Sequence, residues 1–278
     1  MPHDFNQKII EEFRANSGQV TLFEGGRLIL LTTIGRRTGV PRTTPVAYLP
    51  DKDRILIVAS AGGAPRHPDW FYNLVANPEV TVETGFFTYR ARAVVLEGAE
   101  RDEMFARAVE ADSRWAEYQA KTSRVIPVVA LYETEMINGP AQASSWGAGL
   151  KLIHDALRRE FALIRKEVAE SGPRVGVQLR VNCLTACHGL HYHHTSEDAT
   201  ILPFLAEHRP DLASVLERVA QEHQKIAALL EELQRVLTDD TLDRSPLISA
   251  VERLTAEVEA HLAYEEEQLI PALDALSS

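Results

Sequence analysis

The sequence lacks the features that mark several large classes of protein. It contains only two cysteines in 278 residues, too few for a disulfide framework. No apolar run is long enough to span a bilayer, and no segment has the form of a secretory leader. No G-x-G-x-x-G fingerprint is present to support a dinucleotide-binding fold. We therefore expect a reducing, cytoplasmic location and no membrane span.

Basic charge is also scarce, and its distribution is uneven. The net charge of −11 argues against nucleic acid as the main partner. Residues 1–140 hold 16 Lys/Arg and 18 Asp/Glu, whereas the remaining residues hold 13 and 22. Eight of the ten histidines lie beyond residue 150. Acidity and histidine thus gather in the C-terminal half, which points to two domains of different chemistry.

The first half of the chain alternates short β-rich runs with turn clusters. We expect strands over 28–34, 43–49, 54–60, 79–84, 87–96 and 125–132. Two helices interrupt them, one from Pro68 to about Ala76 and one over roughly Arg101–Lys121. These elements predict one β-dominated, barrel-like domain over residues 1–135.

The second half is helical throughout. Residues 136–149 lose periodicity and gain Gly, Ser, Ala and Pro, so we expect a linker there. Apolar stripes of period 3.6 follow over 150–168, 212–230 and 247–269, with a further helix around 183–204. Four helices with short connections predict an antiparallel bundle over 150–278. The fold class is therefore α+β multidomain, a barrel-like β domain followed by an all-α four-helix bundle.

One motif occurs twice in the helical half, as His193-x3-Glu197-x5-Pro203 and as His261-x3-Glu265-x5-Pro271. A His and a Glu four residues apart lie on one face of a helix. The other two stripes each place one histidine inward, and these are His154 and His223. A single inward histidine is commonly just a hydrogen-bonded core residue. Four of them, with two inward carboxylates that are costly to bury unpaired, predict a metal site.

The ligand types indicate which metal is held. Mixed imidazole and carboxylate, with more than four candidate ligands, does not suit a closed tetrahedral zinc site. It suits iron, with manganese as an alternative. The order H, HxxxE, H, HxxxE over residues 150–275 resembles the hemerythrin-like (HHE cation-binding) domain.

The resemblance implies a di-iron centre that reacts with O2, peroxide or NO. It implies bridging carboxylates from Glu197 and Glu265 and end-on ligands from His154, His193, His223 and His261, with His194 as a further ligand. Glu266 is an alternative to Glu265, although the spacing to the proline favours Glu265. His188 and His191 are left open between outer donors and surface residues. Cys183 and Cys187 are left open between a redox pair and buried core.

Two loops in the first half could hold an anionic ligand. One is Gly-flanked and basic, which suits a phosphorylated or polycarboxylate ligand, and its arginines are Arg36, Arg37 and Arg42. The other allows close approach of the backbone through Ser60, Gly62 and Gly63. The helix that begins near Pro68 could face its positive end to the same anion. The alternative is a pair of ordinary solvated turns.

Three strings carry a second resemblance: TTIGRRTGVPRTTPVAYL, VASAGGAPRHPDWFYNLVANPEVTVE and EYQAKTSRVIPVVALYE. Over residues 5–133 the chain resembles the deazaflavin-dependent nitroreductase family, split β-barrel enzymes related to FMN-binding proteins. The resemblance implies coenzyme F420, the reduction of quinones, nitro compounds or similar acceptors, and a homodimer. It departs from the family pattern at Ala61, where relatives commonly carry Lys, and at Trp115, where they often show Tyr.

The same resemblance implies roles for individual residues. The coenzyme's phosphate and oligoglutamate tail would lie on Arg36, Arg37 and Arg42. Its remaining contacts would come from Ser60, Gly62, Gly63, Trp70 and Asn73. The substrate pocket would be faced by Tyr118 and Trp115, which are the candidate catalytic residues.

Two functional hypotheses follow. The first is an F420H2-dependent oxidoreductase that reduces a small-molecule electron acceptor and carries a di-iron domain. The second is an O2-, NO- or iron-binding or sensing protein whose barrel is an independent coenzyme-binding module.

Overall fold

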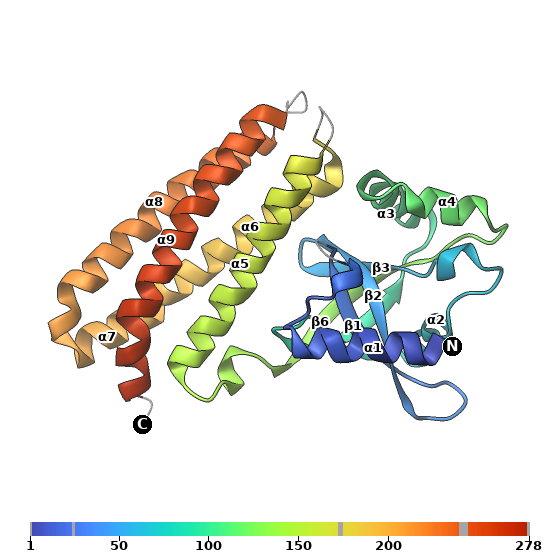
Figure 1. Cartoon of the computed structure of the whole chain (residues 1–278), viewed down its shortest axis with the longest axis horizontal. Coiled ribbons are helices and arrows are strands. Elements are labelled where there is room, and N and C mark those ends of the chain that lie inside the picture. The colour runs from blue at the N-terminus through green and yellow to red at the C-terminus, as the bar shows by residue number, and fades with distance from the viewer. Residues whose placement is uncertain (1, 24–25, 172–174, 239–243, 277–278) are drawn as a thin grey trace. The chain divides into compact units, whose positions relative to one another are not determined.

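The computed structural model describes residues 2–23, 26–171, 175–238 and 244–276, with side chains from residue 5 onward. The chain divides into two compact units, Met1–Asn138 and Gly139–Ser278. The first unit holds the strands and the second is helical (Figure 1). The predicted fold class is confirmed.

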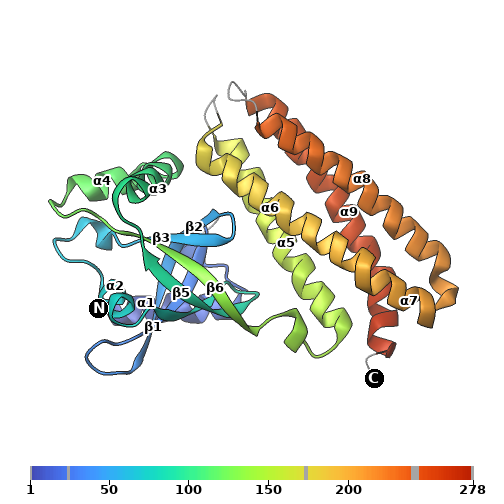
Figure 2. The ribbon, with the colours of Figure 1, turned by 180° about the vertical axis from the view of Figure 1, so that it is seen from behind.

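The first unit is a β-barrel. Its strands are β1 (Leu28–Ile34), β2 (Pro41–Asp51), β3 (Arg54–Val58), β4 (Glu79–Glu83), β5 (Thr88–Val95) and β6 (Val128–Asn138). Among the described residues they close in the order β1-β2-β3-β6-β5-β4, with each neighbouring pair antiparallel. Figure 2 labels β1, β2, β3, β5 and β6 in a view from behind. All six predicted runs are strands. Their alternating and β-branched residues suit a pleated surface with one buried face.

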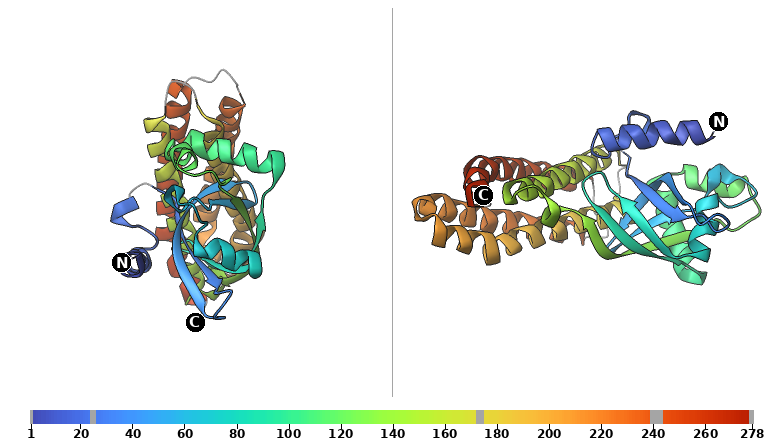
Figure 3. Two further views of the ribbon diagram at one scale, coloured as in Figure 1. Left: turned by 90° about the vertical axis from the view of Figure 1, so that its right-hand side faces the viewer. Right: turned by 90° about the horizontal axis from the view of Figure 1, so that it is seen from below.

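Strand β1 is buried on both faces, which explains its unbroken apolar run. Ile29 and Leu31 lie in the interior cluster of the barrel. Leu28 and Leu30 point the other way and pack under α1 (Pro2–Ala15). Successive side chains on a strand alternate between its two faces. The four residues 28–31 therefore contribute to the barrel interior on one face and to the cluster under α1 on the other. Figure 3 shows α1 on the outside of the barrel.

The remaining helices of this unit differ in part from expectation. They are η1 (Thr21–Phe23), η2 (Ala61–Gly63), α2 (Asp69–Ala76), α3 (Gly98–Ala111) and α4 (Arg114–Ala120). Helix α2 matches its prediction, whereas α1 was not predicted. The single helix expected over 101–121 is wrong, because the chain breaks into α3 and α4 at Asp112. The carboxylate of Asp112 accepts a hydrogen bond from the backbone N–H of Arg114 (3.0 Å), which begins a new helix.

The second unit is a bundle of long helices. Its elements are η3 (Pro140–Gln142), α5 (Trp146–Glu170), α6 (Val177–Ser196), the π-turn η4 (Glu197–Ile201), α7 (Leu202–His208), η5 (Pro210–Leu212), α8 (Ala213–Leu237) and α9 (Arg244–Leu276). The apolar stripes of α5, α6, α8 and α9 meet in one buried cluster. The four predicted helical segments therefore form the bundle, with α7 continuing α6 beyond the π-turn (Figure 1). No helix in the described parts of the chain is long and apolar enough to cross a bilayer.

The boundary between the units is shorter than the expected linker of 136–149. Strand β6 continues to Asn138 because Met136 and Asn138 still pair with β5. Helix α5 begins at Trp146, where the hydroxyl of Ser145 accepts the N–H of Ala148 (3.1 Å) as an N-cap. Only residues 139–145, including η3, lie between the two elements.

The two copies of the His-x3-Glu-x5-Pro motif adopt different backbones. The first copy widens into a π-turn that starts at Glu197 and leads to Pro203. The second copy stays within α9, with Pro271 inside the helix. A proline ring clashes with the carbonyl four residues earlier, and a wider turn relieves that clash. Equal spacing in sequence therefore does not give equal geometry.

Candidate functional site

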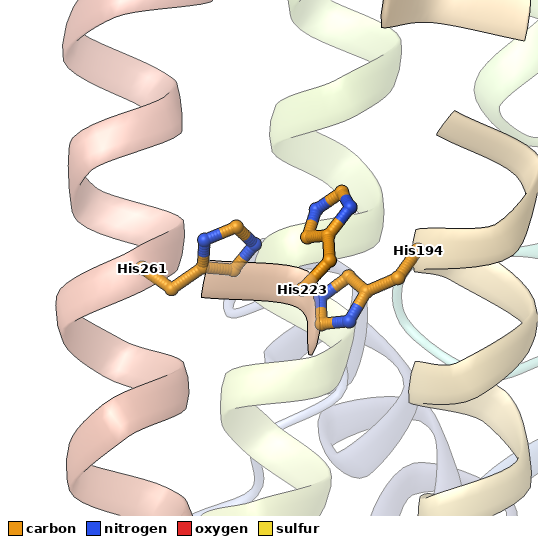
Figure 4. Close-up of side chains that lie close together, drawn as sticks. All are labelled: His194, His223 and His261. Carbon is orange, nitrogen blue, oxygen red and sulfur yellow. The ribbon is translucent and has the colours of Figure 1, made fainter. Parts of the chain in front are cut away.

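The predicted metal ligands come together inside the bundle. They are His154 on α5, His193 and His194 on α6, Glu197 at the start of the π-turn, His223 on α8, and His261 and Glu265 on α9. All seven are buried, with at most 6% of their surface exposed. They form two groups whose ligand atoms lie within 4.8 Å of one another: His194, His223 and His261 in one, and His154, His193, Glu197 and Glu265 in the other. Figure 4 shows the rings of His194, His223 and His261 close together, with centres 4.3–4.9 Å apart.

Within the described parts of the chain, the inward-facing atoms of these residues have no hydrogen-bond partner. This is true of Nε2 in all five imidazoles and of both oxygens of both carboxylates. Buried polar atoms are nearly always paired, because leaving one unsatisfied costs about 1–3 kcal/mol or more. Nine such atoms in one place are better explained by a bound cation than by an uncompensated cost of burial. The donor set of imidazole and carboxylate fits iron or manganese.

The spacing of the atoms also fits shared metal ions. Oε2 of Glu265 lies 3.4 Å from Nε2 of His154 and 3.3 Å from Nε2 of His261. Oε1 of the same carboxylate lies 3.4 Å from Nε2 of His223. Ligand atoms about 2.0–2.2 Å from one ion are roughly 3 Å apart from each other. Glu265 therefore reaches both groups, as a bridging carboxylate must.

Glu197 and Glu266 lie in different positions relative to the cluster of inward imidazoles. Oε2 of Glu197 lies 3.5 Å from Nε2 of His193 and 3.6 Å from Nε2 of His223, so it too borders both groups. Glu266 lies outside the cluster, where it accepts a hydrogen bond from Nδ1 of His154 (3.0 Å) and one from Arg158. The geometry therefore places Glu265, and not Glu266, among the inward ligands.

Sequence reasoning missed the groups behind the imidazoles. Nδ1 of His154 faces Glu266 (3.0 Å), Nδ1 of His223 faces Asp198 (2.8 Å), and Nδ1 of His261 faces Glu222 (3.0 Å). Each of these carboxylates is the sequence neighbour of a predicted ligand: Glu265, Glu197 and His223 respectively. That adjacency is the signal that could have found them.

The cluster buries at least one charged carboxylate. Burial lowers the pKa of His193 to about 3 and that of His194 to about 2, so both imidazoles are neutral. Burial and the nearby Glu265 raise the pKa of Glu197. Burial also opposes ionisation of Glu265, but His154 and His223 outweigh it and its pKa is lowered. At least one buried carboxylate is thus charged, and a cation would offset that charge.

The four residues left open in the helical half lie away from this centre. His188 and His191 are exposed on α6 and belong to neither ligand group. Cys183 and Cys187 are not joined in a disulfide and lie buried in the bundle core, with 1% and 0% exposed. The core interpretation of the cysteines therefore fits the structure.

The barrel unit carries a groove of about 660 Å³ lined by five arginines. Three of them were predicted, Arg36, Arg37 and Arg42, and two were not, Arg14 and Arg66. Trp70 and Asn73 also line the groove, as predicted. Asp69 is the one acidic residue among the described residues that line it. Such a surface suits a ligand with several negative charges.

Asn73 fixes the basic loop that forms one wall of this groove. Its amide donates to Oγ1 of Thr33 (3.1 Å) and accepts the backbone N–H of Arg36 (3.1 Å). The guanidinium of Arg36 lies 4.7 Å from the centre of the Tyr72 ring, a cation–π contact. Asn73 is itself buried. It therefore supports the groove as well as lining it.

The second predicted loop, Ser60 to Gly63, does not line the groove. Ala61, Gly62 and Gly63 all have positive φ, at 48°, 63° and 84°. A Cβ on Gly63 would come within 2.7 Å of the carbonyl oxygen of Tyr118, so only glycine fits there. The hydroxyl of Ser60 accepts the N–H of Gly62 (3.4 Å) and closes the turn.

Arg124 holds this loop from the other side. Its guanidinium donates to the backbone carbonyls of Ala59 (3.2 Å), Ser60 (2.5 Å) and Ala64 (2.9 Å). It also donates to Nδ1 of His67 (2.8 Å), just before α2. Sequence reasoning missed Arg124, and its place within the family-like string was the signal that could have found it.

The two predicted catalytic residues lie on α4. The rings of Trp115 and Tyr118 meet edge to face with their centres 5.8 Å apart. Both pack, partly buried, against the cluster that contains Leu56 and Ile126. Neither lines the arginine groove. Their predicted place at a substrate pocket stays a prediction.

Comparison with known proteins finds a matching family model for each of the two units. Residues 6–133 match the family model for F420H(2)-dependent quinone reductase. An F420H(2)-dependent quinone reductase of Mycobacterium tuberculosis is 42% identical over 108 residues, which are 37% of this chain and 71% of that protein. The chain belongs to the F420H(2)-dependent quinone reductase family. Residues 148–273 match the hemerythrin HHE cation binding domain, so the chain also carries a hemerythrin-like domain.

Two further similarities are lower in sequence identity. A putative F420H(2)-dependent quinone reductase of M. tuberculosis is 34% identical over 103 residues, 37% of this chain and 87% of that protein. A solved structure described as an F420-H2 dependent reductase (FDR-A) is 40% identical and covers 38% of this chain and 93% of that one, with a TM-score of 0.36. The relatives correspond to the barrel unit, and the predicted family resemblances of both units are confirmed.

Proposed function

We propose that the barrel binds coenzyme F420 in the arginine-lined groove and reduces a quinone-type small-molecule acceptor. Five arginines around one groove, in a chain of net charge −11, carry this proposal. The reduced coenzyme, when bound, supplies hydride chemistry. Arg36, Arg37 and Arg42, together with Arg66, would hold its anionic part by charge-assisted hydrogen bonds.

The other residues of the groove would orient the ligand. Trp70 offers an apolar ring at the groove wall, and Asn73 keeps the basic loop in place through its two hydrogen bonds. Arg14 already binds Glu83 through two hydrogen bonds, at 2.8 and 2.6 Å, so its charge is partly satisfied. The measurement that tests the assignment is binding of F420, FMN and nicotinamide cofactors to the purified chain. Tight FMN binding with no affinity for F420 would overturn it.

We further propose that the bundle holds two iron ions, ligated by the seven residues assembled above. The nine unpartnered inward atoms support this. Iron there supplies redox chemistry toward O2, peroxide or NO. The imidazoles and carboxylates bind and position it, and the apolar core around them excludes water. Iron and manganese per chain, measured on protein purified aerobically, test this directly.

A second candidate is supported by the way the two sites are built. Every groove residue belongs to the first unit and every inward ligand to the second. Each site is thus complete within one compact unit. On this candidate the bundle carries or senses O2, NO or iron, and the barrel works independently.

Removal of one ligand distinguishes the two candidates. In the joint enzyme, F420H2-dependent consumption of O2 vanishes in His193→Ala while coenzyme binding is unchanged. In the independent arrangement, quinone reduction by the barrel is the same in His193→Ala and in the unaltered chain. The predicted homodimer and the predicted cytoplasmic location stay proposals, and sedimentation of the purified protein tests the first.

A further inference from the structure

The three carboxylates behind the metal-facing imidazoles share one arrangement. Asp198, Glu222 and Glu266 are partly exposed, with side-chain exposures of 47%, 24% and 18%. The imidazoles that they contact are buried, with side-chain exposures of 4% or less. Nδ1 thus faces a carboxylate at the edge of the bundle, and Nε2 faces the interior.

This arrangement fixes the proton on each ring. A carboxylate can only accept a hydrogen bond, so the facing Nδ1 must carry the hydrogen. In a neutral imidazole, Nε2 then keeps a free lone pair, the form that binds a metal. The negative charge behind the ring also makes Nε2 a stronger donor to the metal. His154, His223 and His261 are therefore prepared for ligation before an ion arrives.

The three pairs are not equivalent, because two of the carboxylates share their charge with an arginine. Glu222 accepts Nε of Arg218 (2.8 Å), and Glu266 uses the same oxygen for His154 and for Arg158. Asp198 has no Lys or Arg within 4.0 Å among the residues that the structure describes. Its contact with His223 is also the shortest of the three, at 2.8 Å against 3.0 Å.

Asp198 owes its position to the π-turn. Glu197 begins this turn and points into the metal cluster, while Asp198, the next residue, contacts the far side of His223. The π-turn thus places two carboxylates on opposite sides of the His223 ring. Glu197 lies on the side of Nε2, toward the metal cluster, and Asp198 lies on the side of Nδ1. π-turns within helices occur most often at functional sites.

We propose that Asp198 is the positioning residue that sets the redox potential of the metal group formed by His194, His223 and His261. Its uncompensated charge acts through His223 and favours the oxidised ion. This inference rests on the proposed metal centre and goes beyond it, because it predicts an order among three otherwise similar carboxylates. The substitution Asp198→Asn keeps the hydrogen-bond acceptor and removes the charge.

The test compares three isosteric variants of the full iron-loaded chain: Asp198→Asn, Glu222→Gln and Glu266→Gln. We expect all three to keep two metal ions per chain. We expect Asp198→Asn to raise the midpoint potential of the centre by about 60 mV, which is a tenfold change in a one-electron equilibrium constant. The other two shifts are smaller, because Arg218 and Arg158 already offset those charges. Glu207→Gln, at an exposed residue of α7, is the control and leaves the potential unchanged.

A second measurement separates positioning from simple structure. Asp198→Ala removes the acceptor as well as the charge, so it should weaken binding of Co2+ to the metal-free chain by about 10–100-fold. Far-ultraviolet circular dichroism checks that the bundle is folded. The inference is wrong if Asp198→Asn leaves the potential unchanged, or if Glu222→Gln shifts it as much. An unaltered chain that binds no metal would instead contradict the metal centre itself.

Discussion

The guanidinium of Arg124 donates to the carbonyl oxygen of Ser60 across a distance of 2.5 Å. The same guanidinium binds the carbonyls of Ala59 and Ala64, so three backbone oxygens converge on one charge. This contact offsets the strain of Ala61, a non-glycine residue with a φ of 48°. The loop that the family resemblance assigns to the coenzyme is thus held by a residue more than sixty positions later.

Replacing Arg124 should loosen this loop. Hydrogen bonds to charged groups contribute about 1.5–3 kcal/mol each, so Arg124→Ala should lower the free energy of unfolding of the barrel by at least that amount. Arg124→Lys keeps the charge but lacks the planar fork, and it should recover only part of that stability. Chemical denaturation followed by tryptophan fluorescence measures both. Equal stability of all three proteins would show that the loop holds itself.

The arginines of the groove should each contribute to coenzyme binding. Arg36→Ala, Arg42→Ala and Arg66→Ala should weaken F420 affinity by about 1.5–3 kcal/mol for each charge-assisted hydrogen bond that the substitution removes. Arg90→Ala, at an exposed arginine on β5 outside the groove, is the matched control. Titration calorimetry at two salt concentrations gives the affinities. No change in the three groove variants would place the coenzyme elsewhere.

Removal of a bridging carboxylate should empty the metal site. Glu197→Ala and Glu265→Ala should each release most of the bound metal and lower the melting temperature of the bundle, since metal binding and folding are coupled. Glu267→Ala, at an exposed position two residues after Glu265, should keep both. Metal analysis and calorimetry provide the readouts. If the variant with both Glu197→Ala and Glu265→Ala still binds its full complement of metal, the assignment of these residues as metal ligands is wrong.

Asp51 should make the barrel sensitive to acid. Its carboxylate accepts hydrogen bonds from Arg107 (2.8 Å) and Arg54 (2.7 Å), and its side chain is 5% exposed. Burial opposes ionisation, but the two guanidinium groups outweigh it and lower the pKa below the usual 3.8. The stabilisation is therefore present above about pH 3.8 and is lost as the pH falls through the lower, folded-state value.

Substitution of Asp51 should show the contribution of its carboxylate to stability at neutral pH. Asp51→Ala should destabilise the barrel by up to about 3–5 kcal/mol, because Arg54 and Arg107 both lose the buried carboxylate that they share. Arg54 keeps its ion pair with the more exposed Glu100 (2.9 Å). Asp53→Ala, at an exposed position in the same turn, should have little effect. Denaturation at pH 7 and at pH 3 compares the two variants. Similar curves for both would mean that this ion pair is energetically neutral.

The two cysteines should be inert in the folded chain. Burial raises the pKa of Cys187 to about 12, so almost no thiolate is present at neutral pH. Ellman's reagent should therefore react with neither cysteine until denaturant is added, and then with both. Rapid reaction in the native state would revive the redox-pair interpretation.

The sequence predicts those features that depend on local periodicity. The six strands follow from alternating and β-branched runs, and the inward ligands follow from the four-residue spacing of His193 and Glu197 on one helical face. Helix α1 was not predicted because its apolar positions, such as Ile9 and Phe13, become a buried stripe only against β1. Its stability is thus a tertiary effect that local pattern does not reveal.

Contacts between elements were the part that sequence could not supply. The partners of Nδ1 depend on the register of one helix against the next, as with His223 and Asp198. Placement of Ser60 away from the arginine groove depends on how barrel loops fold over α4. The π-turn at Glu197 likewise differs from the matching segment at Glu265, although the two motifs have identical spacing.

The adjacency of each outer carboxylate to an inner ligand has a consequence for the mechanics of the bundle. Helices α8 and α9 are joined by an inner and an outer contact. Glu265 of α9 lies 3.4 Å from Nε2 of His223 on α8, and His261 of α9 contacts Glu222 on α8. Sliding α9 by one turn, about 5.4 Å, would break the inner and the outer contacts together. The two contacts together therefore admit a single alignment of α8 and α9. Insertion of one residue into either helix between Glu222 and His261 should break that alignment.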